Sequence, residues 1–80
     1  MQLNIQAFGI ARDIVGGSVV QLQVDEKITA AELKSLLQAR FEPLSKISSF
    51  MLAINDEYAQ PADLVNAGDE IAIIPPVSGG

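Results

Sequence analysis

Residues 29–44, with the sequence TAAELKSLLQARFEPL, predict the main helix of this 80-residue chain. The helix begins with a capping box, in which the Thr29 hydroxyl and the Glu32 carboxylate each accept a hydrogen bond from an otherwise unpaired backbone amide. Apolar residues then recur every three or four positions and predict one stripe that packs on a sheet. The stripe contains Leu33, Leu36, Leu37, Phe41 and Leu44. Pro43 is expected to end or distort the helix, because proline has no amide hydrogen.

Two strands are expected before this helix. Apolar and polar residues alternate over residues 2–8 and again over 20–24, which is typical of a strand with one face on a core. A helical turn over 11–15 and a turn at Gly16-Gly17 separate them. Because this connection is too short for a crossover, antiparallel pairing is expected. Phe8 falls in phase with the glutamines, so its side chain is expected to point away from the core.

Three strands are expected after the helix, over residues 50–54, 58–60 and 70–74. An acidic turn at Asn55-Asp56-Glu57 separates the first two. Adjacent carboxylates in a turn are usually solvated, so no metal site is assigned to this turn.

The remaining segments predict connections. Residues 45–49 are expected to form a loop, residues 61–65 a connector with one helical turn, and residues 66–69 a turn. One helix lying across a sheet is then the economical α+β arrangement, because the helix stripe and the inward strand faces share one core.

Composition limits what the chain does alone. With no cysteine and no histidine, it lacks a thiolate nucleophile and the commonest general base and metal ligand. A net charge of −5 argues against binding to nucleic acid, which needs Lys and Arg to neutralise phosphates. We find no signal peptide and no membrane-spanning stretch, so a cytoplasmic protein without a membrane partner is expected. The length allows one domain over residues 1–74, followed by a tail over 75–80.

The tail is Pro75-Pro76-Val77-Ser78-Gly79-Gly80. Consecutive prolines favour an extended start, and glycines without a Cβ give a slim end that fits a narrow channel. Its full reach is at most roughly 20 Å at about 3.3–3.6 Å per residue, enough to enter a pocket of a neighbouring protein. The alternative is a frayed terminus or a cloning remnant. Direct attachment to an apolar strand, without a polar spacer, favours a tail with a function.

The order of elements and the Gly-Gly ending resemble the β-grasp fold of ubiquitin-like proteins, and more closely the small, sulfur-carrying subunit of molybdopterin synthase. Four pieces carry the resemblance: Phe8 with residues 12–16, residues 52–55, residues 68–71, and the tail. The ending is the most specific of them. Gly9 departs from the alanine expected at its position in that family.

The resemblance implies a mixed sheet in which the first and last strands are adjacent and parallel. Counting phase along the last strand then places Ile71 and Ile73 toward the helix, and Ala72 and Ile74 on the outer face near Phe8. Met51 and Ala53 extend this outer face.

Three residues are candidates for binding the partner. Phe8 and Ile74 form an apolar patch beside the tail, which suits a docking surface. The alternative is that Phe8 tucks under the following loop and that Ile74 is an ordinary exposed residue. For Arg12, contact with the partner and capping of its local turn are equal alternatives.

The resemblance also implies the chemistry. A separate ATP-dependent enzyme adenylates the Gly80 carboxylate, and a sulfur donor converts the acyl-adenylate to a thiocarboxylate. The threading residues are Pro75, Pro76, Val77, Ser78 and Gly79. They enter the large subunit of molybdopterin synthase, whose residues direct sulfur to a cyclic pyranopterin precursor to form the dithiolene. Ser78 either hydrogen-bonds in that channel or is simply small enough to pass. The chain itself is expected to be non-catalytic and to bind no cofactor, since ATP is used by the activating enzyme.

Three alternatives remain at this point. The sulfur carrier of thiamine biosynthesis has a similar fold and the same terminal chemistry, although the PPVSGG ending and the full helix favour molybdopterin. A ubiquitin-like modifier would instead join its terminus to lysines. A pure interaction domain would have a tail without chemistry.

Overall fold

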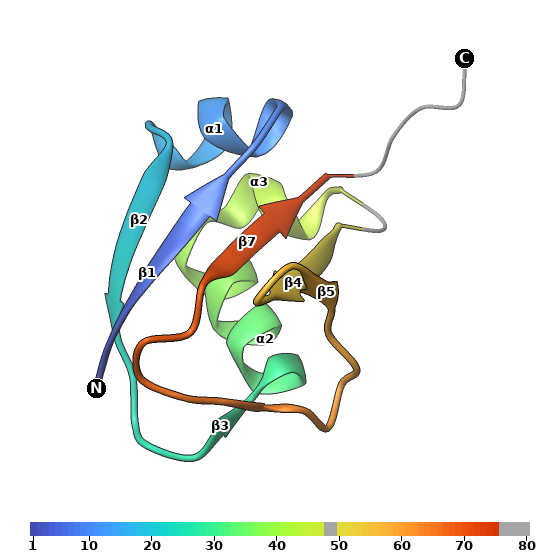
Figure 1. Cartoon of the computed structure of the whole chain (residues 1–80). Coiled ribbons are helices and arrows are strands. Elements are labelled where there is room, and N and C mark those ends of the chain that lie inside the picture. The colour runs from blue at the N-terminus through green and yellow to red at the C-terminus, as the bar shows by residue number, and fades with distance from the viewer. Residues whose placement is uncertain (48–49, 76–80) are drawn as a thin grey trace.

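The computed structural model describes residues 1–47 and 50–75. A five-stranded sheet with strand order β2-β1-β7-β4-β5 has helix α2 across one face (Figure 1). A separate two-stranded sheet joins β3 to β6. The elements are β1 (Gln2–Ala7), α1 (Ile10–Val15), β2 (Val19–Gln23), β3 (Ile28–Thr29), α2 (Ala30–Arg40), α3 (Glu42–Ser45), β4 (Met51–Ile54), β5 (Glu57–Tyr58), β6 (Leu64–Val65) and β7 (Ile71–Ile74). The predicted α+β arrangement is confirmed.

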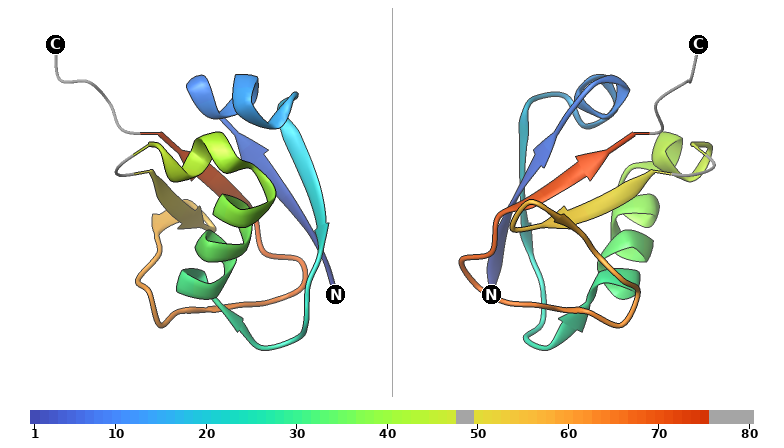
Figure 2. Two further views of the ribbon diagram at one scale, coloured as in Figure 1. Left: turned by 180° about the vertical axis from the view of Figure 1, so that it is seen from behind. Right: turned by 45° about the vertical axis from the view of Figure 1, so that its right-hand side comes forward.

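The sheet is mixed. Strand β1 pairs antiparallel with β2, as predicted, and parallel with β7, where Ile5 lies opposite Ile71. On the other side of β7, β4 pairs antiparallel and forms a hairpin with β5. Because β1 and β7 are parallel, their carboxyl ends reach the same end of the sheet, and α1 also lies there (Figure 2).

The core lies between α2 and the inner face of the sheet. Leu33 and Leu37 of α2 are fully buried, and so are Ile71 and Ile73 of β7, which confirms the phase predicted for that strand. Each such side chain contributes about 1.5–3 kcal/mol relative to an exposed position. Leu36, which was placed in the same stripe, is 37% exposed. It lies at the margin of the helix face, next to β2.

The predicted capping box at the start of α2 is confirmed. The Glu32 amide donates to the Thr29 hydroxyl oxygen at 3.2 Å, and the Thr29 amide donates to a Glu32 carboxylate oxygen at 3.0 Å. The Thr29 hydroxyl also donates to the same carboxylate oxygen at 3.0 Å. These bonds lower the pKa of Glu32 from its ordinary value. The bond from the Thr29 backbone amide has the largest effect, and the bond from the Thr29 hydroxyl the next largest.

The end of α2 comes earlier than the apolar stripe suggested. The helix ends at Arg40, because Phe41 has a non-helical backbone conformation with φ −121° and ψ 89°. Pro43 then lies in the first turn of α3, where its missing amide hydrogen costs no intrahelical bond. Leu44 still reaches the core, but from α3. Within residues 1–47 and 50–75, no helix is both long and apolar enough to cross a membrane.

The helical turn expected over residues 61–65 is wrong. Residues 64 and 65 form β6, which pairs antiparallel with β3. The physical reason is that the first backbone amides of α2 have no acceptor within the helix. The Ala30 amide donates to the Asp63 carbonyl at 2.8 Å, and the Ala31 amide donates to the Pro61 carbonyl at 3.0 Å. The connector is therefore held by helix amides that lack an intrahelical acceptor.

Candidate functional site

The first residue of the tail, Pro75, which we call the tail root, packs against Gly9 in the turn that follows β1. Strand β7 ends at Ile74, and Pro75 follows directly. Gly9 has φ 56°, and a Cβ built on it would lie 3.2 Å from the Pro75 Cγ atom. This approach is closer than ordinary van der Waals contact, so only glycine lets the proline ring pack here without displacement. The remaining tail residues assigned from the sequence lie outside the described residues: Pro76, Val77, Ser78, Gly79 and Gly80.

An apolar surface lies on the outer face of the sheet beside this root. We call it the outer apolar face and define it by Phe8, Met51, Tyr58, Ala72 and Ile74. Phe8 is 49% exposed, Met51 45% and Tyr58 59%, whereas Ala72 and Ile74 are half-buried. Met51 and Ile74 are direct partners in the β4–β7 ladder, so their side chains are neighbours on one face.

The predicted outward positions of Phe8 and Ile74 are confirmed. Both line a hollow of about 300 Å³ on this face, together with Ala53 and Ala72. Phe8 is therefore not tucked under the following segment. Ala53 lies on the outer face as predicted but is itself nearly covered, because its small side chain lies between its strand partners Tyr58 and Ala72.

Tyr58 completes the face and was not predicted from the sequence. It lies opposite Ala53 in the β4–β5 hairpin. The signal available in the sequence was the Asn55-Asp56 pair, because Asn and Asp tolerate positive φ; in the structure both residues have it, at 53° and 68°. Two such residues are typical of a two-residue hairpin loop, and that loop fixes which residues face each other across it.

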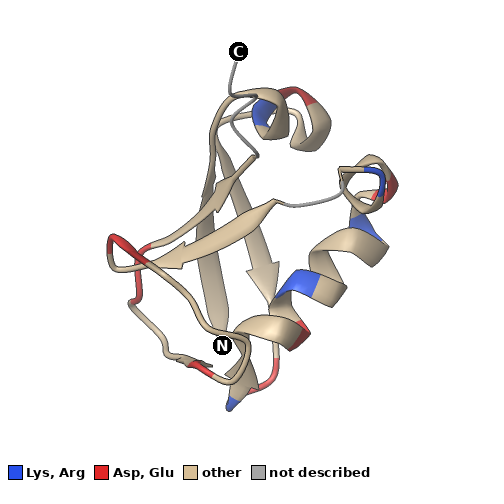
Figure 3. Ribbon diagram, turned by 90° about the vertical axis from the view of Figure 1, so that its right-hand side faces the viewer, with Lys and Arg blue, Asp and Glu red and all other residues tan. Residues whose placement is uncertain are grey.

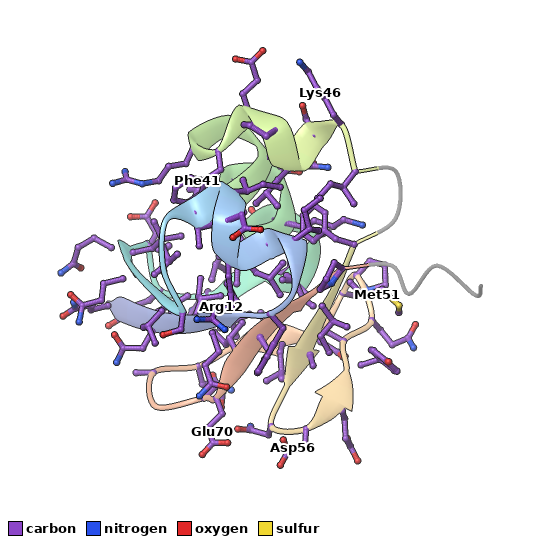
Figure 4. All side chains as sticks on the ribbon, turned by 90° about the horizontal axis from the view of Figure 1, so that it is seen from above. Arg12, Phe41, Lys46, Met51, Asp56 and Glu70 are labelled. Atoms are coloured by element: carbon purple, nitrogen blue, oxygen red, sulfur yellow. The ribbon has the colours of Figure 1, made fainter. Side chains whose placement is uncertain are left out.

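The end of the face away from Met51 is acidic. Asp56 and Glu70 line the hollow, and Figure 4 shows both at this end of the sheet with Met51 at a distance. Figure 3 shows acidic segments on the turns at the same end. A partner with basic groups opposite this rim and apolar groups opposite the face is complementary to it.

Two of the segments that carry the sequence resemblance, residues 52–55 and 68–71, hold the strands of the outer apolar face in place. The Asn55 side-chain amide donates to an Asp69 carboxylate oxygen at 3.1 Å, and the Glu70 backbone amide donates to the Asn55 side-chain oxygen at 3.0 Å. The second Asp69 oxygen accepts from the Asn66 amide at 2.7 Å. These bonds tie the β4–β5 turn to the turn before β7, which fixes the two strands that carry most of the face.

Arg12 does not lie on the outer apolar face. It lies exposed on α1 and does not line the hollow. Its backbone carbonyl accepts the amides of Gly16 at 2.9 Å and Gly17 at 3.0 Å, which closes the helix at a left-handed Gly16. The local role of Arg12 is thus in its main chain, and its labelled side chain in Figure 4 is on the surface.

The described residues hold no cluster of three or more metal-ligating side chains. The chain also has no histidine or cysteine anywhere in its sequence. What the described residues offer is an apolar surface with Pro75, the first residue of the tail, beside it.

The structure resembles solved structures of ubiquitin-like proteins, which defines the class of protein. The chain has the β-grasp fold of ubiquitin-like proteins. It superposes on SAMP1 from Haloferax volcanii with a TM-score of 0.83 and 26% identity, covering all of both chains. It also superposes on a chain of the complex of subunits 1 and 2 of the molybdopterin-converting factor from Helicobacter pylori, with a TM-score of 0.67, 22% identity and full coverage of both chains.

The family follows from the sequence. The profile of the ThiS family matches residues 5–80, and the chain belongs to this family. A molybdopterin synthase sulfur carrier subunit from Drosophila erecta is 35% identical over all of this chain and 92% of that protein. A protein of the same name from Arabidopsis thaliana is 32% identical over all of this chain and 84% of its own length.

Proposed function

We propose that this chain is the sulfur-carrier subunit of a molybdopterin synthase and that Gly80 carries the sulfur as a thiocarboxylate. The observation that supports it best is the position of the tail root. Strand β7 passes straight into Pro75 beside a half-exposed apolar face, so one partner can hold the face while it receives the tail. The names of full-length relatives at 35% and 32% identity favour molybdopterin over thiamine synthesis.

The proposed chemistry begins with activation, because a carboxylate with a pKa near 3.5 is negatively charged and resists nucleophilic attack. A carboxylate oxygen of Gly80 attacks the α-phosphorus of ATP on a separate enzyme, and pyrophosphate leaves. Sulfide delivered by a donor as HS⁻ then attacks the acyl carbon and displaces AMP, and loss of the remaining S–H proton gives the thiocarboxylate. The chain contributes the carried group and no catalytic side chain, in keeping with its lack of histidine and cysteine.

The loaded tail then enters the large subunit, whose residues direct transfer to the cyclic pyranopterin precursor. In each transfer the thiocarboxylate sulfur bonds to a carbon of the precursor, and water then cleaves the bond between the sulfur and the acyl carbon, which returns Gly80 to a carboxylate. A dithiolene needs two sulfur atoms, so two loaded tails serve one product. Ordering the tail costs roughly 1–2 kcal/mol per residue. Burial of the outer apolar face, at about 25 cal/mol per Å², offsets that cost. The proline pair reduces it further, because prolines are already restricted.

A truncation tests this proposal. Deletion of Gly79 and Gly80 should abolish sulfur transfer to the precursor while the large subunit still binds, because the outer apolar face is intact. A variant with Gly79 and Gly80 both replaced by alanine keeps the tail length and the terminal carboxylate, so it separates loss of transfer through shortening from loss of transfer through a wider tail end. Full transfer activity of the truncated chain would exclude the tail as the carrier.

A second function is favoured by one comparison. SAMP1 from Haloferax volcanii is 26% identical over both full chains, and a second similar structure from that organism is named small archaeal modifier protein 1. A modifier uses the same activated terminus, but a lysine amine attacks the acyl carbon and forms an isopeptide bond. Blotting cell extracts for this chain distinguishes the two, since a modifier gives higher-mass conjugates that the Gly79-Gly80 deletion removes.

A further inference from the structure

The two edges of the five-stranded sheet are built differently. Edge strand β5 has two residues, one of them Glu57, and it follows Asp56. Short, charged edges resist the addition of another strand. Edge strand β2 spans Val19–Gln23 with the sequence VVQLQ, which contains no charge and no proline, and its register with β1 is continuous. It lacks the features that usually block strand addition.

The hydrogen-bonding groups at this edge follow from the β1–β2 ladder. The Met1 amino group donates to the Val24 carbonyl at 2.7 Å, and the Val24 amide donates to the Met1 carbonyl at 2.8 Å. Bonded pairs alternate along an antiparallel ladder, so every second residue of β2 faces β1. The residues between them turn their N–H and C=O groups outward: Val19, Gln21 and Gln23.

A groove between β2 and α2 runs along the same edge. Leu22 and the 37%-exposed Leu36 lie in it, and its charged residue is Arg40. An adjoining hollow continues past the end of β2, where it is lined by Asp25 and Glu26. Figure 3 shows the matching gradient on α2, which is acidic at its N-terminal end and basic further along.

We propose that β2 pairs antiparallel with β2 of a second copy of this chain, with the two-fold axis at Gln21. In this register Gln21 lies opposite Gln21 of the second copy, and Val19 lies opposite Gln23 of the second copy, so the outward backbone groups satisfy each other. The antiparallel direction carries Asp25 and Glu26 of each copy toward the Arg40 end of the other copy's groove. The same patch is used twice, as a two-fold interface requires.

The pairing leaves the outer apolar face and the tail root free. Strand order places β1 between β2 and β7, so the junction lies at the edge opposite β4 and β5. In the dimer, both outer apolar faces and both Pro75 residues therefore remain accessible to other partners. This inference does not depend on the proposed function, because it concerns association of the chain with itself.

Sedimentation equilibrium of the full chain over a concentration series tests the proposal. The wild-type chain should show a monomer–dimer equilibrium, and Gln21→Lys should weaken it at least about tenfold, because it sets two like charges opposite each other across the axis. Asn4→Lys is the matched control. Asn4 is the neighbour of Gln21 on the same exposed face, but on β1, one strand inside the edge. Its association should equal that of the wild type.

A charge exchange tests the register. Arg40→Glu should weaken association, and adding Asp25→Lys and Glu26→Lys to the same chain should restore it, while circular dichroism confirms that each variant is folded. A wild-type chain that stays monomeric at millimolar concentration would overturn the proposal. A dimer that resists Gln21→Lys but is lost in Tyr58→Ser would also overturn it, since that dimer uses the outer apolar face.

Discussion

Replacing Gly9 with alanine tests how the root of the tail is set. Gly9 has φ 56° and ψ −134°, a backbone conformation that costs an ordinary residue roughly 1–3 kcal/mol. Alanine also lowers the conformational entropy of the unfolded chain, which by itself raises the free energy of unfolding by about 0.4–1 kcal/mol. The net loss in the free energy of unfolding should be roughly 0.5–2 kcal/mol, or several degrees in Tm for a domain of this size.

The controls separate backbone strain from contact with the tail. Gly16 has φ 84°, but nothing lies within 4 Å of the position that a Cβ would take there, so Gly16→Ala should lose similar stability without touching Pro75. Gly17 has neither positive φ nor a neighbour at that position, and Gly17→Ala should be close to neutral. Thermal unfolding followed by circular dichroism measures all three variants.

Binding to the large subunit, measured by calorimetry, gives the second readout. Gly9→Ala forces Pro75 to shift by a few tenths of an ångström, because the new Cβ would lie 3.2 Å from its ring. We expect a loss of about 1 kcal/mol in binding, roughly fivefold in Kd, that Gly16→Ala does not show. Unchanged affinity in Gly9→Ala would refute this explanation and would mean that the corner relaxes to accept alanine, the residue expected here in similar carriers.

Two further predictions concern the outer apolar face and the start of α2. Phe8→Ala and Ile74→Ala should each weaken binding to the large subunit by at least about 1 kcal/mol with little loss of fold, whereas truncating the exposed Leu64 of β6 should not; equal affinities by calorimetry would count against the face. Thr29→Ala should lower the free energy of unfolding by about 0.5–2 kcal/mol in urea titrations. Since the pKa of Glu32 is lowered in the folded state, the contribution of Glu32 to the free energy of unfolding is present above its ordinary value of 4.5 and is lost as pH falls through the folded value. Glu32→Gln should remove this part of the dependence of stability on pH. An unchanged profile of stability against pH in this variant would contradict the prediction.

Local signals in the sequence were sufficient for much of the fold. The capping box fixed the start of α2, because its two partners are only three residues apart. Alternation predicted the β1–β2 hairpin and the outward position of Phe8, since one face of each strand is covered by the helix. The phase of β7 and the outward position of Ile74 were instead counted along the strand after the family resemblance had placed β1 and β7 side by side.

The missed features depend on contacts between distant segments. The β3–β6 pair involves only two residues on each strand, too few to show a period, and it is held by amides at the start of α2. The packing of Pro75 on Gly9 arises only after β1 and β7 are side by side. Leu44 kept its predicted buried position although α2 had already ended, because α3 carries it to the same core.

Intact mass spectrometry tests most directly whether Gly80 carries the sulfur. The full chain is incubated with an activating enzyme of the family, ATP and a sulfide source, beside a known carrier as positive control. We predict a gain equal to the mass difference between sulfur and oxygen, located in the C-terminal peptide and absent when Gly79 and Gly80 are deleted. An unchanged mass under conditions that load the known carrier would contradict it.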